Sequence, residues 1–222
     1  MPIDFYYAPV VGQCRFIELT ARTLGVDLNF KELDLMIKKE HLTPEFLKIN
    51  PQHCIPTIVD NGFALWESPV IATYLVETYG KTDSLYPKDV KKRAVVDQRL
   101  YFNNGVLDQR LAEYYYPVIA GKGAPDPEKY KKVEEALEFL DGFLGAAEYV
   151  AGDSMTLADF AIATTLSTYD VAKLKRSDYK NVSRWYKALQ TSVPAFEDIN
   201  SVKKLTKMFQ ELAKKAKQLA KQ

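Results

Sequence analysis

The sequence predicts an α+β protein in two parts, a mixed segment of strands and helices over residues 1–80 and an all-helical segment over 90–222. Two patterns and the stretch between them carry this prediction. In the mixed segment, stretches of period-two alternation stand beside stretches of helical spacing, whereas from residue 90 onward the apolar residues recur at helical spacing. Residues 81–89 are polar, contain Pro87 and show no periodicity, which indicates a linker.

The mixed segment begins with a predicted strand, a helix and a second strand. Apolar and polar residues alternate from Ile3 to Tyr7, as in a strand with one buried face. Apolar residues then recur at helical spacing from Cys14, and Gly25 occupies the position that follows a helix C-terminus. The second strand is predicted over residues 28–33.

The rest of the mixed segment predicts a short helix or turn over 41–49, a hairpin over 57–66 and a final helix. Asn61-Gly62 is a strong signal for the hairpin turn. Ser68 is the expected cap of the last helix, with Pro69 in its first position. The resulting order, β-α-β-α-β-β-α, is found in few small folds and predicts a thioredoxin-like domain.

The all-helical segment predicts five helices, over residues 90–120, 127–146, 156–172, 179–191 and 202–220. Thr156 and Asp159 form a capping box at the start of the third helix, and Met155 and Phe160 are placed to form a hydrophobic staple. We interpret this motif as the start of a buried helix without a chemical role.

Composition and charge narrow the class of protein. The 30 Lys and Arg residues nearly balance the 29 Asp and Glu residues, so there is no basic excess for binding nucleic acid. With 47% hydrophobic residues the chain can bury a sizeable core. We find no signal peptide and no membrane-spanning stretch, and we therefore expect a cytoplasmic protein. Cys14 and Cys54 are too few for a disulfide framework and wrongly spaced for a metal site, so no metal is expected.

The stretch from Asn50 to Thr57, followed by Glu67-Ser68, is the most informative part of the sequence. Ile55 before Pro56, just ahead of a strand, suits a cis peptide bond that exposes backbone groups to a peptide ligand. Glu67-Ser68 places an acid and a hydroxyl at a helix N-terminus, which can hold a carboxylate. Taken singly these residues fit a turn and a cap, but together they predict a site for a small zwitterionic peptide.

Residues 50–68 resemble the glutathione-binding stretch of insect delta-class glutathione S-transferases, and the resemblance covers residues 3 to about 196. Residues 80–87, 92–95, 114–117 and 149–154 match that class too. The resemblance implies a thioredoxin-like domain followed by an all-helical domain, a homodimer, and the conjugation of reduced glutathione to small hydrophobic electrophiles. It also assigns glutathione-binding roles to His41, His53, Ile55, Glu67 and Ser68.

The thiol-activating position departs from the family pattern. In the delta class the turn after the first strand reads Pro-Gly-Ser-Ser-Pro-Cys-Arg, and its first Ser donates a hydrogen bond to the glutathione sulfur. Here Val11 stands at that position and Gly12 at the second Ser. Because valine offers no donor to a thiolate, we expect slower catalysis and leave the catalytic residue unassigned. Gly12 at the helix terminus and Tyr6 are weak candidates, and Cys14 is interpreted as a core thiol.

Two further departures concern the ligands themselves. Pro69 stands where the delta class usually has an Arg that helps to hold the γ-glutamyl carboxylate, so we expect weaker glutathione binding. Asp108 and Leu111 occupy positions where that class tends to place Tyr and Phe. The resemblance therefore implies an altered hydrophobic substrate pocket, still lined by Tyr116 and Phe209.

The predicted C-terminal helix, together with the last two residues of the chain, carries seven Lys and one acid, Glu211, and its other face is apolar. Such a helix can lie on a membrane or an acidic partner, but we favour the interpretation that its apolar stripe covers the active-site cleft. Three functions remain open for the whole chain. The first is an impaired glutathione transferase, and the second is a non-catalytic protein that binds ligands or a protein partner. The third is an enzyme for a substrate that needs no thiol activation, such as an isomerase that uses glutathione as cofactor.

Overall fold

A computed structural model describes residues 2–119 and 123–219. The N-terminal part contains a sheet of four strands in the order β2-β1-β3-β4. They are β1 (Ile3–Tyr7), β2 (Leu28–Glu32), β3 (Thr57–Asp60) and β4 (Phe63–Trp66). β1 runs parallel to β2 and antiparallel to β3, and β3 pairs antiparallel with β4 through the Asn61-Gly62 turn. With helices α1 (Gly12–Leu24), α2 (Pro44–Ile49) and α3 (Ser68–Tyr79), the predicted thioredoxin-like order is confirmed.

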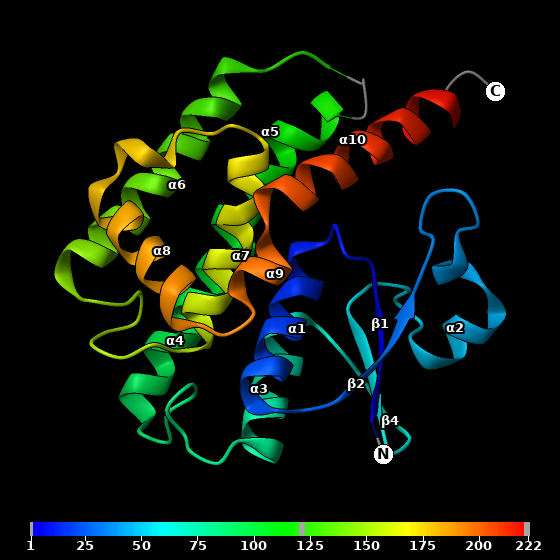
Figure 1. Ribbon diagram of the computed structural model, residues 1–222, viewed down its shortest axis with the longest axis horizontal. Coiled ribbons are helices and arrows are strands. Elements are labelled where there is room, and N and C mark those ends of the chain that lie inside the picture. Colours follow the sequence, from blue (N-terminus) through cyan, green and yellow to red (C-terminus); the bar gives the residue numbers. More distant parts are fainter. Residues whose placement is uncertain (1, 120–122, 220–222) are drawn as a thin grey trace.

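The two faces of this sheet are covered differently. Figure 1 shows α1 and α3 between the sheet and the helical part, with α2 on the far side. Phe5 is fully buried, whereas Tyr6 packs edge-on against Phe46 of α2, with ring centroids 5.4 Å apart. The period-two alternation of the first strand therefore separates a core face from an α2 face.

The C-terminal part is helical wherever it is regular. Its elements are α4 (Val90–Phe102), the π-helical segment η2 (Asn103–Asp108), α5 (Gln109–Ile119), α6 (Pro127–Ala146), α7 (Leu157–Val171), the short turn η3 (Arg176–Asp178), α8 (Lys180–Ser192), α9 (Phe196–Asn200) and α10 (Val202–Leu219). Residues 80–89 connect α3 to α4 without a helix or strand. None of the described helices is both long and apolar enough to cross a membrane.

Three of the predicted helices agree with the structure to within one residue at each end, and a fourth needs a correction. The stretch 90–120 is not one α-helix, because η2 interrupts it between α4 and α5. This segment contains Asn103-Asn104-Gly105, residues of low helix propensity, which gives a physical reason for the wider π turn there. Residues 120 and 220, the predicted ends of two helices, lie outside the described residues.

The capping box at the start of α7 forms as predicted around a fully buried carboxylate. Asp159 accepts hydrogen bonds from the Thr156 backbone N–H at 2.7 Å and the Thr156 hydroxyl at 3.0 Å. It also accepts from the Val150 N–H at 3.0 Å and the Trp185 indole at 2.8 Å. The box therefore fixes α7, the central helix, to α8 and to the loop before it.

Arg15 joins the two parts of the molecule. Its buried guanidinium extends from α1 and donates hydrogen bonds of 2.9–3.3 Å to the Val10 and Thr164 carbonyls, the Ser167 and Thr168 hydroxyls, and the Asn200 side-chain oxygen. Burial lowers the pKa of Arg15 to about 10, which leaves it a cation at neutral pH. The N-terminus of α1 is thus held against α7 and α9.

Candidate functional site

The loop before β3 is organised by one amide side chain. Asn50 is buried, and its Nδ2 donates to the Cys54 carbonyl at 3.0 Å and the Thr57 hydroxyl at 2.9 Å. Its Oδ1 accepts the Gln52 backbone N–H at 2.9 Å. The Ile55–Pro56 peptide bond within this loop is cis, as the sequence predicts. Sequence reasoning missed the role of Asn50, although an Asn before a Pro at the end of a helix is a signal for such a turn.

The rings of His41 and His53 lie close together, with their centroids 6.2 Å apart. The Nδ1 atom of His41 is buried and has no hydrogen-bond partner within the described residues. Burial lowers the pKa of His41, and the neighbouring His53 and Lys39 lower it further, so the ring is neutral at pH 7. The Nδ1 atom of this neutral imidazole can form a hydrogen bond with a ligand.

The N-terminus of α3 supplies a second group of polar atoms. Glu67 adopts φ 71°, ψ 106°, a conformation that is uncommon for a residue with a side chain and is found at functional sites. Its carboxyl group is exposed, while Ser68 is buried at the first helical position. Sequence analysis placed the cap at Ser68, and the structure moves it one residue earlier, to Glu67. Pro69 follows within the first turn, where it has no N–H to offer a ligand.

The N-terminus of α1 is the third part of the site. Val11 is its N-cap residue and makes no side-chain capping bond. The backbone N–H groups of Cys14 and Arg15 donate to the Val11 carbonyl, whereas those of Gly12 and Gln13 have no partner among the described residues. Two free N–H groups and the positive end of the helix dipole can together stabilise an anion.

The other candidates near this helix terminus do not supply a replacement donor. Cys14 is buried, and burial raises its pKa to about 12, so the thiol stays protonated and serves as a core residue. Tyr6 packs on the α2 side of the sheet, and burial raises its pKa as well. Gly12 offers only its backbone N–H. Among these groups, the free N–H groups of α1 are the ones able to contact an anion at the start of this helix.

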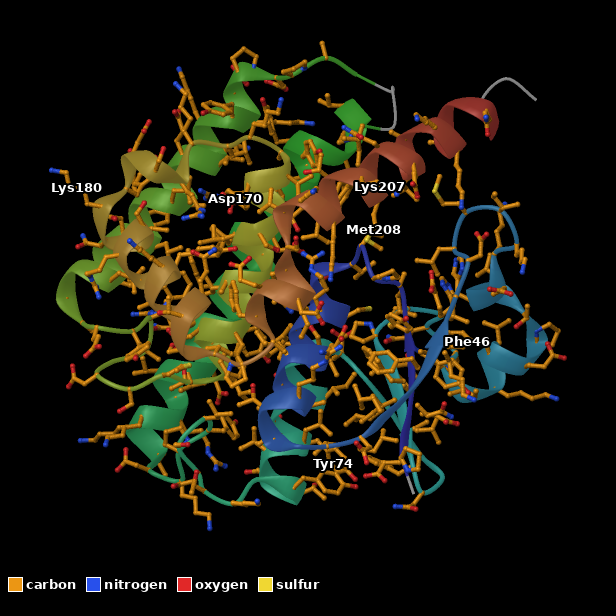
Figure 2. All side chains as sticks on the ribbon, in the orientation of Figure 1. Phe46, Tyr74, Asp170, Lys180, Lys207 and Met208 are labelled. Atoms are coloured by element: carbon orange, nitrogen blue, oxygen red, sulfur yellow. The ribbon has the colours of Figure 1, made fainter. Side chains whose placement is uncertain are left out.

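A cleft of about 640 Å³ opens beside this terminus. One wall is the turn from Ala8 to Val11, and a second is formed by residues of segment 32–40. Tyr116 and residues of α10, including Met208 and Phe209, complete the lining, which is mainly apolar. Figure 2 shows Met208 on the underside of α10, above the β1–α1 turn. Tyr116 and Phe209 thus line the same mainly apolar cleft.

Leu111 and Asp108 are not among the residues that line this cleft. Leu111 is fully buried in the hydrophobic core. Asp108, at the end of η2, accepts a hydrogen bond of 2.7 Å from the Gln13 side chain in the first turn of α1. Burial raises the pKa of this carboxyl, although the Gln13 hydrogen bond and the charge of Arg15 lower it. The sequence gives no sign of the Gln13–Asp108 pair, because 95 positions separate its members.

Helix α10 has two different faces. Leu205 and Phe209 are buried in a small cluster with Val171, and Tyr115 packs against it. Lys204 pairs with Asp198 at 2.6 Å. The apolar face of α10 thus contributes both to this buried cluster and to the wall of the cleft. Across residues 2–119 and 123–219 we find no cluster of three or more His, Cys, Asp or Glu side chains that could hold a metal ion.

Comparisons with known proteins agree with this geometry. Residues 7–77 match the family model of the glutathione S-transferase N-terminal domain, and residues 108–188 match that of the C-terminal domain. The structure is similar to a delta-class glutathione transferase of Nilaparvata lugens, with 48% identity over 97% of this chain and 100% of the other, and a TM-score of 0.90.

Two further insect structures are similar over nearly the whole chain. The Bombyx mori glutathione transferase BmGSTD1 has 41% identity over 95% of this chain and 97% of its own, with a TM-score of 0.90. Isozyme E7 of Drosophila melanogaster has 39% identity over 96% of both chains and a TM-score of 0.86. The similarity includes both the sheet domain and the helical domain.

Proposed function

The chain belongs to the glutathione S-transferase family, and from that premise we propose that it conjugates reduced glutathione to small hydrophobic electrophiles. The observation that carries the proposal is the pair of N–H groups at the start of α1, next to an apolar cleft, that have no partner in residues 2–119 and 123–219. A thiolate is an anion, and a helix N-terminus favours it over the thiol. We place the activity in the cytoplasm and assign it no metal.

We place glutathione along the loop before β3 and the N-termini of α3 and α1. In this proposal the Ile55 backbone pairs with the cysteinyl part, and Glu67 and Ser68 hold the γ-glutamyl end. His41 and His53 contact the remainder of the peptide, which is consistent with the unpartnered Nδ1 of His41. Tyr116 and Phe209 contact the electrophile from the cleft.

The missing hydroxyl at Val11 argues for reduced activity. The loss of one preorganised donor to a developing anion costs about 3 kcal/mol, or roughly 10²–10³ in rate. Pro69 removes a backbone donor from the other end of the ligand. Both changes weaken glutathione binding or activation without closing the apolar cleft.

A ligand-binding protein is the second candidate, since Val11 and Pro69 affect the same ligand while the apolar cleft of about 640 Å³ remains. The double substitution Val11→Ser with Pro69→Arg separates the two. A gain of orders of magnitude in conjugation supports an enzyme whose remaining machinery is intact. No gain supports the binding protein.

We also propose that two copies of this chain associate. Phe63 of β4 is 52% exposed and Tyr101 of α4 is 80% exposed, and the Phe63 ring packs on Tyr74 of α3 with centroids 5.6 Å apart. Aromatic residues are enriched in the contact surfaces of protein–protein interfaces. Sedimentation velocity measures the oligomeric state directly. A monomer at micromolar concentration contradicts this part of the proposal.

The test of the function combines calorimetry with turnover on one sample. Reduced glutathione is titrated into the protein, and conjugation of a generic aromatic electrophile is then followed. Binding with measurable turnover supports the enzyme, and binding without turnover supports the ligand-binding protein. Absence of glutathione binding overturns both assignments of the site.

A further inference from the structure

The cleft continues beyond Tyr116 and Phe209, the two residues that the proposed function uses. Farther out, one wall is formed by residues of the loop segment 33–38 and the other by residues of the α10 segment 211–216. Figure 1 shows the second half of α10 extending above the loop that follows β2. We call the space between these two segments the outer cleft.

The outer cleft is elongated and has apolar groups on both walls. Met208 and Ala216, eight positions apart on α10, both line the cleft, which therefore runs for about 12 Å along this helix. Leu212 lines it from α10, and Leu35 and Met36 line it from the loop. None of these three side chains is buried, so a ligand that covers them removes apolar surface from water.

The two walls of the outer cleft are held to the rest of the molecule differently. Asp34 braces the loop, because its Oδ1 atom accepts the backbone N–H groups of Met36 and Ile37 at 3.0 and 2.8 Å. The Asp34 N–H donates to the Glu40 carboxylate at 2.7 Å. The buried contacts of α10 end at Phe209, and no described side chain beyond it on this helix is buried or makes a hydrogen bond or ion pair. The loop is thus the fixed wall, and the second half of α10 is the wall that can move.

Charged groups of opposite sign stand on the two walls. Lys215 lines the cleft from α10, and Asp34 lines it from the loop. In residues 2–119 and 123–219 no Lys, Arg or His nitrogen lies within 4 Å of the Asp34 carboxylate. The Ile37 backbone hydrogen bond lowers the pKa of Asp34, and the charge of Lys215 lowers it as well, so the ammonium is near the carboxylate without contacting it.

We propose that the electrophile carries an extended apolar body that lies in the outer cleft, and that Lys215 closes onto Asp34 across it. This inference rests on the proposed function, which places the glutathione sulfur at the N-terminus of α1. Val11 of that terminus lines the same cleft, so the reacting end lies there and the body extends outward between Leu35 and Leu212. A short electrophile leaves the outer cleft to water and gains neither these apolar contacts nor the closure.

The first experiment measures binding to the cleft without glutathione and without any reaction. Straight-chain primary alcohols of increasing length displace the fluorescent probe N-phenyl-1-naphthylamine from the protein. We expect the affinity to rise about threefold with each added carbon until the chain spans about 12 Å, and then to level off. An affinity that does not grow with chain length overturns the inference.

Leu212→Ser tests the α10 wall. The substitution removes an apolar group from the outer cleft, and it should weaken binding of the longest alcohols about tenfold while the shortest bind as before. Val202→Ser is the matched control, because Val202 is an exposed apolar residue of the same helix and is not among the residues that line the cleft. Equal effects of the two substitutions, or equal weakening of long and short alcohols by Leu212→Ser, overturn the inference.

A double-mutant cycle tests the closure. Lys215→Met removes the ammonium, and Asp34→Asn removes the negative charge while its Oδ1 atom still accepts the N–H groups of the loop. Each substitution should speed dissociation of a long alcohol by up to about fivefold, and the double substitution should add nothing to the larger single effect. Stopped-flow fluorescence follows the dissociation as the probe replaces the alcohol.

Lys214→Met is the control for the cycle, since Lys214 is exposed and is not among the residues that line the cleft, and it should leave the dissociation rate unchanged. Fully additive effects of Lys215→Met and Asp34→Asn contradict a pair between the two groups and overturn the closure.

Turnover connects the outer cleft to the proposed function. For a series of α,β-unsaturated ketones with straight alkyl chains, kcat/KM with glutathione should rise with chain length as the affinity of the alcohols does. Turnover that is independent of chain length overturns the inference while the proposed function stands. Length-dependent binding of alcohols to a protein that binds no glutathione overturns the proposed function and leaves the outer cleft a site for apolar ligands.

Discussion

At the scale of single residues, Val11 determines which hydrogen-bond donors the N-terminus of α1 offers to an anion. It caps the helix with no side-chain hydrogen bond, and within the part of the chain that the structure describes the backbone N–H groups of Gly12 and Gln13 have no partner. The residue type was visible in the sequence, and so was the consequence of placing an apolar side chain at this position. What the sequence could not show is the Gln13–Asp108 contact behind it, because nothing local relates residues 95 positions apart.

Val11→Ser should raise kcat/KM for conjugation by roughly 10²-fold, since the new hydroxyl donates to the thiolate. Initial rates with a generic aromatic electrophile measure the effect. Val10→Ser is the matched control, because Val10 also lines the cleft but precedes the cap. Equal rates for the two variants would contradict the role given to position 11.

Asn50 links the residues of the predicted binding loop. Asn50→Ala should weaken glutathione binding by about tenfold, because the loop from Gln52 to Thr57 loses the amide that fixes its shape. Calorimetry gives the affinity. Asn61→Ala, in the exposed hairpin turn away from this loop, serves as the control, and a similar loss there would show that the effect is general destabilisation.

At the scale of elements, local signals predicted most of the fold. Alternation in β1, the Asn-Gly turn between β3 and β4 and the capping box of α7 each depend on neighbours within a few positions, so a sequence pattern contains them. The π segment η2 escaped prediction because the apolar spacing continues on both sides of it. Asn103, Asn104 and Gly105 have low helix propensity, but such residues alone do not distinguish a π turn from an ordinary helical turn.

Asp159→Ala should lower the free energy of unfolding by about 3 kcal/mol, because the substitution leaves four donors without their acceptor in the core. Urea denaturation followed by circular dichroism measures the change. Asp126→Ala removes the N-cap of α6 at an exposed site and should cost about 1 kcal/mol. A loss of the same size at both positions would contradict the larger contribution to stability that we assign to the buried capping box of α7.

At the scale of the whole molecule, the sheet domain and the helical domain meet at a buried cation. Arg15 on α1 contacts α7 and the Asn200 side chain, and this contact sets how α1 presents its N-terminus to the cleft. The sequence shows an arginine inside an amphipathic helix, where a solvated side chain is the ordinary expectation. Its burial is a property of the packed domains.

Arg15→Lys should lower the free energy of unfolding by about 3 kcal/mol, because an ammonium cannot reach acceptors on three sides as the planar guanidinium does. Urea denaturation again measures the loss. Arg22→Lys is the control on the same helix, since its ion pairs with Glu18 and Asp198 are exposed and should be worth less than about 1 kcal/mol. Equal losses in the free energy of unfolding would mean that the buried Arg15 hydrogen bonds contribute no more to stability than an exposed ion pair.

The acceptors of Arg15 have one more consequence. Each of them is a carbonyl, a hydroxyl or an amide oxygen, none of which gains or loses a proton between weakly acidic and weakly alkaline solution. A joint made with carboxylates would loosen on acidification, and an exposed one would weaken in salt. The Arg15 contact should therefore be indifferent to both, so that an acid- or salt-dependent change in the docking of the two domains originates at their carboxylate contacts, Gln13–Asp108 and Arg22–Asp198.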